Sequence, residues 1–275
     1  MSVSLLKVGE IYCRSVLSRS SLYDIDYSIN PYVGCEHACV YCYSPFYVGR
    51  KFSGLNWGDY VYVKINAPRI LLRELKRNPV GSVLISSITD PYQPLEGKFM
   101  VTRRLLELLV KSNLEIYILT KSPLVVRDLD VISMFKNVHV GFSFTNLDES
   151  LRVKFEPKAP SVTDRLLALK NICNSGVKSY AFIAPFMPIN RDLAYSLMDE
   201  FSSIGVNYVV VDRFNIHGDP HDFINRLTPL LSGELIKQFE EILLHKYNYY
   251  RYYKSLKDDL IRYAKKINLN LYFSY

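Results

Sequence analysis

Residues 82–121 read SVLISSITDPYQPLEGKFMVTRRLLELLVKSNLEIYILTK and place a helical pattern between two apolar runs. The runs at 82–87 and 114–120 are short and rich in Ile and Leu, which favours strands. Between them, residues 102–112 carry apolar side chains at spacings of three and four, which is typical of a helix with one buried face. A strand, a helix and a second strand predict two parallel strands joined by a right-handed crossover.

The same alternation continues on both sides of this stretch. Further strands are predicted at 27–33, 138–145, 178–186 and 207–214, and further helices at 65–77, 127–135, 163–173 and 192–203. Six such units predict an α/β fold, namely a partial (β/α)6 TIM-type barrel. The alternative is an open doubly wound sheet, although no Gly-x-Gly-x-x-Gly follows a strand. From Gly218 the pattern becomes mainly helical and Tyr-rich, so we expect a barrel with an N-terminal lead-in over 1–217 and a helical C-terminal extension, packed on it, over 218–275.

Composition is that of a folded protein with a basic surface. Of 275 residues, 49% are hydrophobic and 22% are charged, and the net charge of +7 is compatible with an anionic partner such as nucleic acid. No apolar run approaches the roughly 20 residues that cross a bilayer, and the N-terminus lacks a signal-peptide pattern. We therefore expect a cytoplasmic protein without a membrane partner, in which clustered cysteines bind metal or do chemistry.

The stretch GCEHACVYCYSP, residues 34–45, holds three of the five cysteines with the spacing C-x3-C-x2-C. Three thiolates leave a four-coordinate zinc incomplete unless His37 joins them, although His37 is interpreted here as a loop residue. A cluster of four irons can use three cysteines and leave one iron open. The two remaining cysteines, Cys13 and Cys173, are interpreted as packing thiols.

This spacing, with Tyr41 before the third cysteine, resembles the signature of radical S-adenosylmethionine (SAM) enzymes. The wider stretch YSINPYVGCEHACVYCY, residues 27–43, is similar to the spore photoproduct lyase-like branch, also described as DNA repair photolyase homologues. The similarity covers roughly residues 10 to 215. It continues through SSITDPYQPLE (86–96), LTKSPLVVRDLDVI (119–132), FSFTNLDE (142–149) and FEPKAPSVTDRLLAL (155–169).

The resemblance implies a [4Fe-4S] cluster bound by Cys35, Cys39 and Cys42, with SAM chelated at the open iron. In such enzymes an electron, supplied by a reductant protein, cleaves SAM, and the 5′-deoxyadenosyl radical removes a hydrogen atom from the substrate. The protein then supplies placement and protection. From a different class, the chain could be a non-enzymatic iron–sulfur protein that binds nucleic acid or transfers electrons.

The resemblance also implies SAM contacts at the ends of three strands. Ser87, Thr89 and Asp90 are expected to meet the methionine end of SAM, and their oxygens suit an ammonium group; alternatively they cap a turn before a proline. Lys121 matches a lysine of the family that reaches the ribose or the carboxylate of SAM. Alternatively, Lys121 is an ordinary solvated lysine. Tyr41 is expected beside the adenine, or as ordinary core. The end of the next strand is expected to contact the ribose or the carboxylate of SAM through Ser143, Thr145 and Asn146.

One position departs from the family pattern. In spore photoproduct lyase a cysteine just before the motif matching ITD returns a hydrogen atom to the repaired thymine, whereas this chain has Ser86 and Ser87. A serine O–H bond is too strong for that step, so thymine-dimer repair by this route is not expected. Tyr92 and Tyr43 are candidates to replace the thiol. The substrate is left open between a base in DNA or RNA and a peptide or small molecule.

Two polar segments follow the sixth strand. DRFNIHGDPHDF, residues 212–223, is either a second metal site, with Asp212, His217, Asp219 and His221 among its polar residues, or a polar loop with a turn. KYNYYRYYKSLKDDLIRYAKK, residues 246–266, has seven Lys and Arg among six tyrosines. Such a segment either stacks on unpaired bases or forms a helix whose aromatic face is buried.

Overall fold

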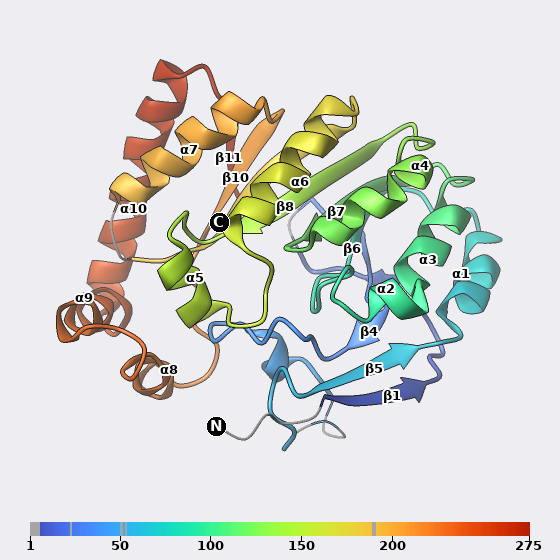
Figure 1. The fold of residues 1–275 in the computed structure, drawn as a ribbon, viewed down its shortest axis with the longest axis horizontal. Coiled ribbons are helices and arrows are strands. Elements are labelled where there is room, and N and C mark those ends of the chain that lie inside the picture. The colour runs from blue at the N-terminus through green and yellow to red at the C-terminus, as the bar shows by residue number, and fades with distance from the viewer. Residues whose placement is uncertain (1–5, 23, 50–51, 53, 189–190) are drawn as a thin grey trace.

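The computed structural model describes residues 6–22, 24–49, 52, 54–188 and 191–275. Its centre is a sheet in the order β11-β10-β9-β8-β7-β6-β3-β2, in which only the pair of β2 and β3 is antiparallel (Figure 1). Within the described residues, β2 and β11 are unpaired edges, so the barrel is open. The predicted α/β class with a parallel sheet is confirmed. The strands are β2 (Ser18–Arg19), β3 (Tyr27–Ile29), β6 (Ser82–Ile85), β7 (Glu115–Thr120), β8 (Val138–Phe144), β9 (Lys178–Phe186), β10 (Tyr208–Arg213) and β11 (Leu271–Phe273).

Helices cover one face of this sheet, and alternate strand residues pack against them (Figure 1). Ile118 of β7 and Phe142 and Phe144 of β8 are fully buried there, and Phe144 lies 5.0 Å from Phe201 of α7. Burying each such side chain stabilises the fold by about 1.5–3 kcal/mol. The helical elements that the structure describes up to residue 204 include η1 (Ser44–Phe46), α1 (Ala67–Leu75), α2 (Glu96–Phe99), α3 (Val101–Leu109), η3 (Pro123–Asp128), α4 (Leu129–Ile132), α5 (Glu149–Phe155), α6 (Val162–Asn174) and α7 (Asp192–Ile204).

The opposite face of the sheet lines the interior of the open barrel with aromatic and polar side chains. His139 of β8 stacks on Tyr117 of β7 at 4.4 Å, and its Nδ1 lies 2.7 Å from the hydroxyl of Tyr208. Its Nε2 lies 3.2 Å from a carboxylate oxygen of Glu115. Tyr208 also stacks on Tyr180 at 5.1 Å. The alternation of apolar outer residues and aromatic inner residues follows from the two-residue period of a strand.

A second, smaller sheet was not predicted. It consists of β1 (Lys7–Ile11) and β5 (Tyr60–Lys64), which are parallel, and β4 (Tyr32–Val33), which is antiparallel to β5. The single strand predicted at 27–33 is therefore wrong, because β3 and β4 belong to different sheets. Pro31 separates them since it has no N–H to donate to a ladder.

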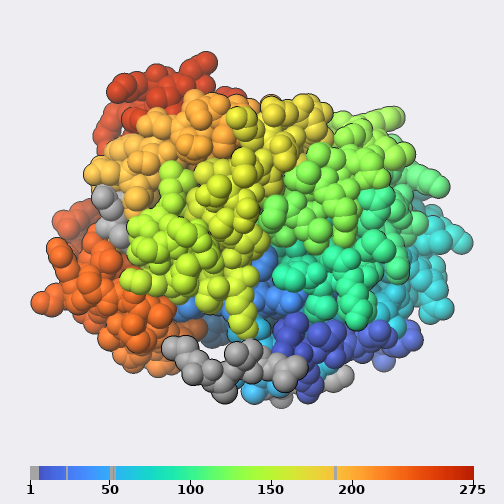
Figure 2. Space-filling model, viewed as in Figure 1, coloured from blue at the N-terminus to red at the C-terminus, as the bar shows by residue number. Residues whose placement is uncertain are grey.

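The C-terminal segment contains α8 (Pro220–Leu227), α9 (Gly233–Leu243) and α10 (Lys246–Lys266) before β11. α10 contacts α7, and β11 pairs with β10, so this segment extends the main sheet as well as adding helices. Figure 2 shows it, in orange and red, adjoining the yellow and green middle of the chain. The boundary at residue 217 stays a prediction. None of the described helices combines the length and apolar character that a bilayer crossing requires.

Candidate active site

The clustered cysteines lie in the loop between β4 and η1. Gly34 opens this loop with a φ of +89°, and a Cβ there would lie 2.2 Å from the carbonyl oxygen of Tyr60, so the turn requires glycine. Burial raises the pKa of each thiol, that of Cys39 to about 12. Cys39 further raises the pKa of Cys35, and Cys42 further raises that of Cys39. Cys39 therefore lies within electrostatic reach of both other thiols.

A single bound metal ion needs several donor side chains at one position. Among the residues that the structure describes, no three His, Cys, Asp or Glu side chains form such a group. Structural zinc needs four convergent ligands. In a cubane cluster each thiolate binds a different iron, so three sulfurs can stand apart. A cluster therefore does not require the three thiolates to converge on one ion, and its presence here stays a prediction.

The cysteine loop is fastened to the loop that follows β6. The side-chain oxygen of Gln93 accepts a hydrogen bond from the backbone N–H of Glu36 at 3.0 Å, and its amide nitrogen donates to the carbonyl of Gly34 at 3.3 Å. The Glu36 carboxylate in turn accepts from the backbone N–H of Leu95 at 2.7 Å. These bonds hold the cysteines over the carboxyl end of β6, where a parallel barrel builds its active site.

The predicted residues of the β6 end lie in this loop. Ser86 adopts a φ of +68°, which is uncommon for a residue other than glycine, and its hydroxyl lies 2.8 Å from that of Thr89. The Ser87 hydroxyl accepts from the Asn30 side chain at 3.3 Å. Strained backbone of this kind is concentrated at functional sites.

Asp90 is buried and connects three segments. One carboxylate oxygen accepts hydrogen bonds from the Thr120 hydroxyl at 2.6 Å and from the backbone N–H of Tyr92 at 2.8 Å. The other accepts from the backbone N–H of Lys121 at 2.7 Å and lies 3.4 Å from His37 Nδ1. Asp90 therefore positions the ends of β6 and β7 against the cysteine loop, and its contact with SAM stays a prediction.

The ends of β7 and β8 bring the other predicted residues to the same place. The Lys121 ammonium donates to the Ser143 hydroxyl at 3.3 Å and lies 5.8 Å from the centre of the Tyr41 ring. The Asn146 side-chain nitrogen donates to the Thr145 hydroxyl at 3.0 Å. The structure therefore gathers residues from three strand ends and the cysteine loop, although their separate roles stay predictions.

The sequence analysis missed a buried ion pair beneath this group. Glu156 and Arg165 are 0% and 1% exposed, and one Glu156 oxygen accepts a hydrogen bond from the Arg165 guanidinium. The other accepts from the Tyr41 hydroxyl and lies 3.9 Å from the Lys121 ammonium. Burial alone would raise the pKa of Glu156, but Arg165 and Lys121 hold it below its ordinary value. In the sequence, this pair was indicated only by its position: Glu156 and Arg165 both fall in the stretch 155–169, which carries the family resemblance.

The buried polar atoms at this site that have no hydrogen-bond partner among the described residues include Nε2 of His37 and the side-chain oxygen of Asn146. Both side chains are at most 2% exposed. A buried polar atom without a partner costs about 1–3 kcal/mol, so it commonly marks a position where a ligand binds. His37 is therefore a buried loop residue that belongs to the site.

The two cysteines outside the cluster lie elsewhere. Cys13 Sγ is 3.3 Å from the Asn66 side-chain oxygen beside α1, and Cys173 Sγ is 3.0 Å from the Ser179 hydroxyl beside α6. Both contacts are those expected of packing thiols.

The tyrosines of α10 divide between the two interpretations, which are stacking on unpaired bases and packing as the buried face of a helix. Tyr249 and Tyr253 donate hydrogen bonds to the carbonyls of Phe214 and Phe186, at 2.8 and 2.9 Å. Tyr247 and Tyr250 are 75% and 52% exposed. Much of the aromatic content of α10 is therefore packing, and only part of it is free for a partner.

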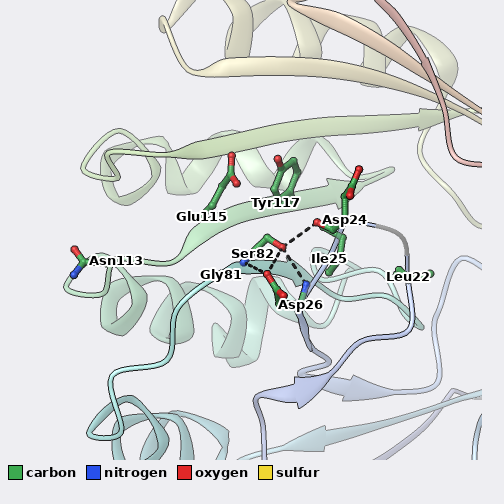
Figure 3. A pocket seen from close by; sticks show the side chains of 9 residues that line it. All are labelled: Leu22, Asp24, Ile25, Asp26, Gly81, Ser82, Asn113, Glu115 and Tyr117. Atoms are coloured by element: carbon green, nitrogen blue, oxygen red, sulfur yellow. Dashed lines mark hydrogen bonds between the residues drawn. The ribbon is translucent and has the colours of Figure 1, made fainter.

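A hollow of about 820 Å³ lies at the opposite, amino-terminal end of the strands (Figure 3). Glu115 and Tyr117 of β7 line it together with Asp24, Asp26 and Ser82. The Asp26 carboxylate accepts from the Ser82 backbone N–H at 2.8 Å, and this bond lowers its pKa. The hollow is separate from the cysteine site.

Comparison with known proteins identifies the family. Residues 29–199 match the family model described as the Radical SAM superfamily. The chain belongs to the Radical SAM superfamily. One sequence relative is an uncharacterized protein of Methanocaldococcus jannaschii. It is 35% identical over 192 residues, which cover 70% of this chain and 72% of that protein. A radical SAM Nalpha-GlyT isomerase of Pseudomonas phage M6 is 23% identical over 66% of this chain and 38% of its own length.

Solved structures show the same radical SAM fold. A structure of spore photoproduct lyase superposes with a TM-score of 0.71 and 16% identity, and covers 98% of this chain and 82% of that chain. Other structures of that lyase are described as complexes with a dinucleoside spore photoproduct and with AdoMet, which is SAM. At this identity the likeness shows the fold alone.

The residues present fit the two groups that radical SAM proteins typically bind, a [4Fe-4S] cluster and SAM. Three thiols without a fourth match a cluster with one open iron. The unpartnered atoms of His37 and Asn146 and the ammonium of Lys121 supply polar contacts beside it. The assignment of Cys35, Cys39 and Cys42 as ligands stays a prediction.

Proposed function

We propose that this radical SAM protein removes a hydrogen atom from a nucleic-acid base. The observation that carries the proposal is the loop of three neighbouring thiols, without a fourth, at the carboxyl end of an open parallel barrel. When bound, the cluster and SAM supply the hydrogen-abstracting radical. The chain itself binds these groups, orients the substrate and excludes water.

The residues of the site divide this work. The three cysteines hold the cluster, and Lys121 and Asn146 contact SAM. Asp90 positions Lys121 through the backbone N–H of that lysine. Because the site is buried, the polar contacts act in a medium of low dielectric, where they are stronger than in water. An unidentified reductant protein supplies the electron.

A base as substrate is supported by similarity and by charge. The structural relative has been solved with a dinucleoside spore photoproduct. The net charge of +7 favours association with phosphates. Repair through a protein thiol is not proposed, because Ser86 stands near the relevant strand end and both Cys13 and Cys173 pack elsewhere.

The test is turnover by the full chain after anaerobic cluster reconstitution and chemical reduction. We expect release of methionine and 5′-deoxyadenosine from SAM, measured by chromatography. Deuterated nucleic acid should pass deuterium into 5′-deoxyadenosine, whereas deuterated peptides and metabolites should not. Cys39→Ala should lose both the iron and the turnover, while the matched control Cys173→Ala should retain them.

The alternatives predict different results. A non-enzymatic cluster protein would release no 5′-deoxyadenosine under these conditions. Deuterium from a peptide or a small molecule would refute a base as the substrate and would leave the radical chemistry intact. A Cys39→Ala protein with a full complement of iron would contradict the ligand assignment.

A further inference from the structure

Four aromatic rings stand together beside the third cysteine. They belong to Tyr43, Phe46 and Tyr47, around η1, and to His217, in the loop after β10. The centre of the His217 ring lies 5.5 Å from that of Tyr43, 6.1 Å from that of Phe46 and 5.6 Å from that of Tyr47. We call these four residues the aromatic rim.

The rim is held in place by specific contacts. The Tyr43 hydroxyl donates to the carbonyl of Ser87, and the Ser44 hydroxyl donates to the carbonyl of Ile88, so η1 is tied to the loop after β6. Phe46 lies against Gly218, where an added Cβ would come within 2.8 Å of its ring. The loop after β10 therefore packs directly on η1, although the two are about 170 residues apart in the sequence.

Much of the rim faces solvent. Tyr43, Phe46 and Tyr47 are 40%, 54% and 58% exposed. Neighbouring exposed aromatic rings are costly in water, and contiguous apolar patches commonly mark a binding surface. Stacking with a planar ring is the interaction that such a group makes best.

The rim adjoins the proposed reaction centre. Tyr43 directly follows Cys42 in the sequence, and its hydroxyl donates to the carbonyl of Ser87, at the end of β6. A cation stands at the end of β10, four residues before His217: Arg213 holds its guanidinium 5.7 Å from the centre of the Tyr249 ring and 5.4 Å from that of Tyr275. It also donates to the Asn215 side-chain oxygen at 3.2 Å. Exposed aromatic rings and nearby cations along the chain are together the combination that binds single-stranded nucleic acid.

We propose that the aromatic rim is a stacking subsite for an unpaired base of a single-stranded nucleic acid, with Arg213 contacting a neighbouring phosphate. This inference rests on the proposed function and deepens it. Base stacking does not depend on which base is present, so the rim gives affinity and placement with little sequence preference. Stacked there, a base lies at the mouth of the barrel beside the cysteine loop.

The test measures binding by the reconstituted full chain. The probe is a fluorescein-labelled oligothymidine of 12 nucleotides, and an abasic oligomer of the same length and charge is the reference. The combined variant Phe46→Ala/Tyr47→Ala should weaken oligothymidine binding by about 5- to 150-fold per base that loses its stack. Its affinity for the abasic oligomer should change less than twofold.

Three further variants serve as controls. Tyr47→Phe keeps the ring and should bind within about twofold of the wild type. Tyr12→Ala removes a tyrosine that is 76% exposed and lies just after β1, in the second sheet, and it should also bind normally. Arg213→Gln should lower the slope of log affinity against log salt by roughly 0.7, as expected for one phosphate contact to a single strand. Circular dichroism of each variant confirms its fold.

The outcomes separate the rim from the radical chemistry. Equal losses for the oligothymidine and the abasic oligomer, or no loss for a folded rim variant, would overturn the subsite. If the wild type released 5′-deoxyadenosine but bound no oligothymidine, the subsite would fail and the radical chemistry would stand. If it bound oligothymidine through the rim but cleaved no SAM, the proposed function would fail and the subsite would stand.

Discussion

Glu156→Gln tests the buried ion pair beneath the cysteine loop. Glutamine keeps the size of the side chain but removes its charge, so the guanidinium of Arg165, 1% exposed, is left without a countercharge. Breaking a buried pair in this way costs about 3–5 kcal/mol. The hydroxyl of Tyr41 and the ammonium of Lys121 lose the same carboxylate as a partner. We therefore expect a loss of several kcal/mol in the free energy of unfolding, measured by urea titration at pH 7.

The pH dependence of that loss follows from the sign of the pKa shift. Because Arg165 and Lys121 hold the pKa of Glu156 below its ordinary value, the carboxylate stabilises the fold above about pH 4.3 and stops doing so as the pH falls. The difference in the free energy of unfolding between the wild type and Glu156→Gln should therefore decrease as the solution becomes acidic.

The matched control for this test is Glu107→Gln. Glu107 is 48% exposed and pairs with Arg103 on the surface, so its loss should cost at most about 1 kcal/mol. A Glu156→Gln protein that was as stable as this control at pH 7 would refute the assigned role of the buried pair.

Two further predictions concern the backbone and the tail. Gly34→Ala should cost more stability than Gly176→Ala in the same urea assay, because both glycines have a positive φ but only at Gly34 would a Cβ meet neighbouring atoms, the nearest being the Tyr60 carbonyl oxygen at 2.2 Å; equal losses would contradict the steric argument. If the exposed side of α10 contacts phosphates, replacing Arg251 and Lys254 with Gln should lower the salt slope of single-strand binding by roughly 1.4, and an unchanged slope would exclude that surface.

The sequence alone predicted the alternation of strands and helices in the main sheet and the superfamily. The apolar runs and the helical spacing that follow one another from 82 to 121 are local signals, and each is complete within about a dozen residues. The spacing of Cys35, Cys39 and Cys42 is equally local. For this reason the parallel α/β sheet and the superfamily could be recognised without coordinates.

The errors and omissions have a common cause. Residues 27–33 have the pattern of one strand, but only the pairing partners show that Pro31 divides it between two sheets. The last strand, β11, is three residues long and becomes recognisable only when it pairs with β10. A strand is stabilised by its neighbours, and a sequence pattern does not name them.

The supporting contacts of the site were decided by tertiary structure alone. Tyr41 and Glu156 are 115 positions apart, and His37 meets Asp90 across 53 positions. The short cysteine motif predicts which side chains hold the cluster, because ligand spacing is a property of one loop. Which charges are buried beneath that loop depends on how distant segments pack, and burial is what turns an ordinary Glu–Arg pair into a structural support.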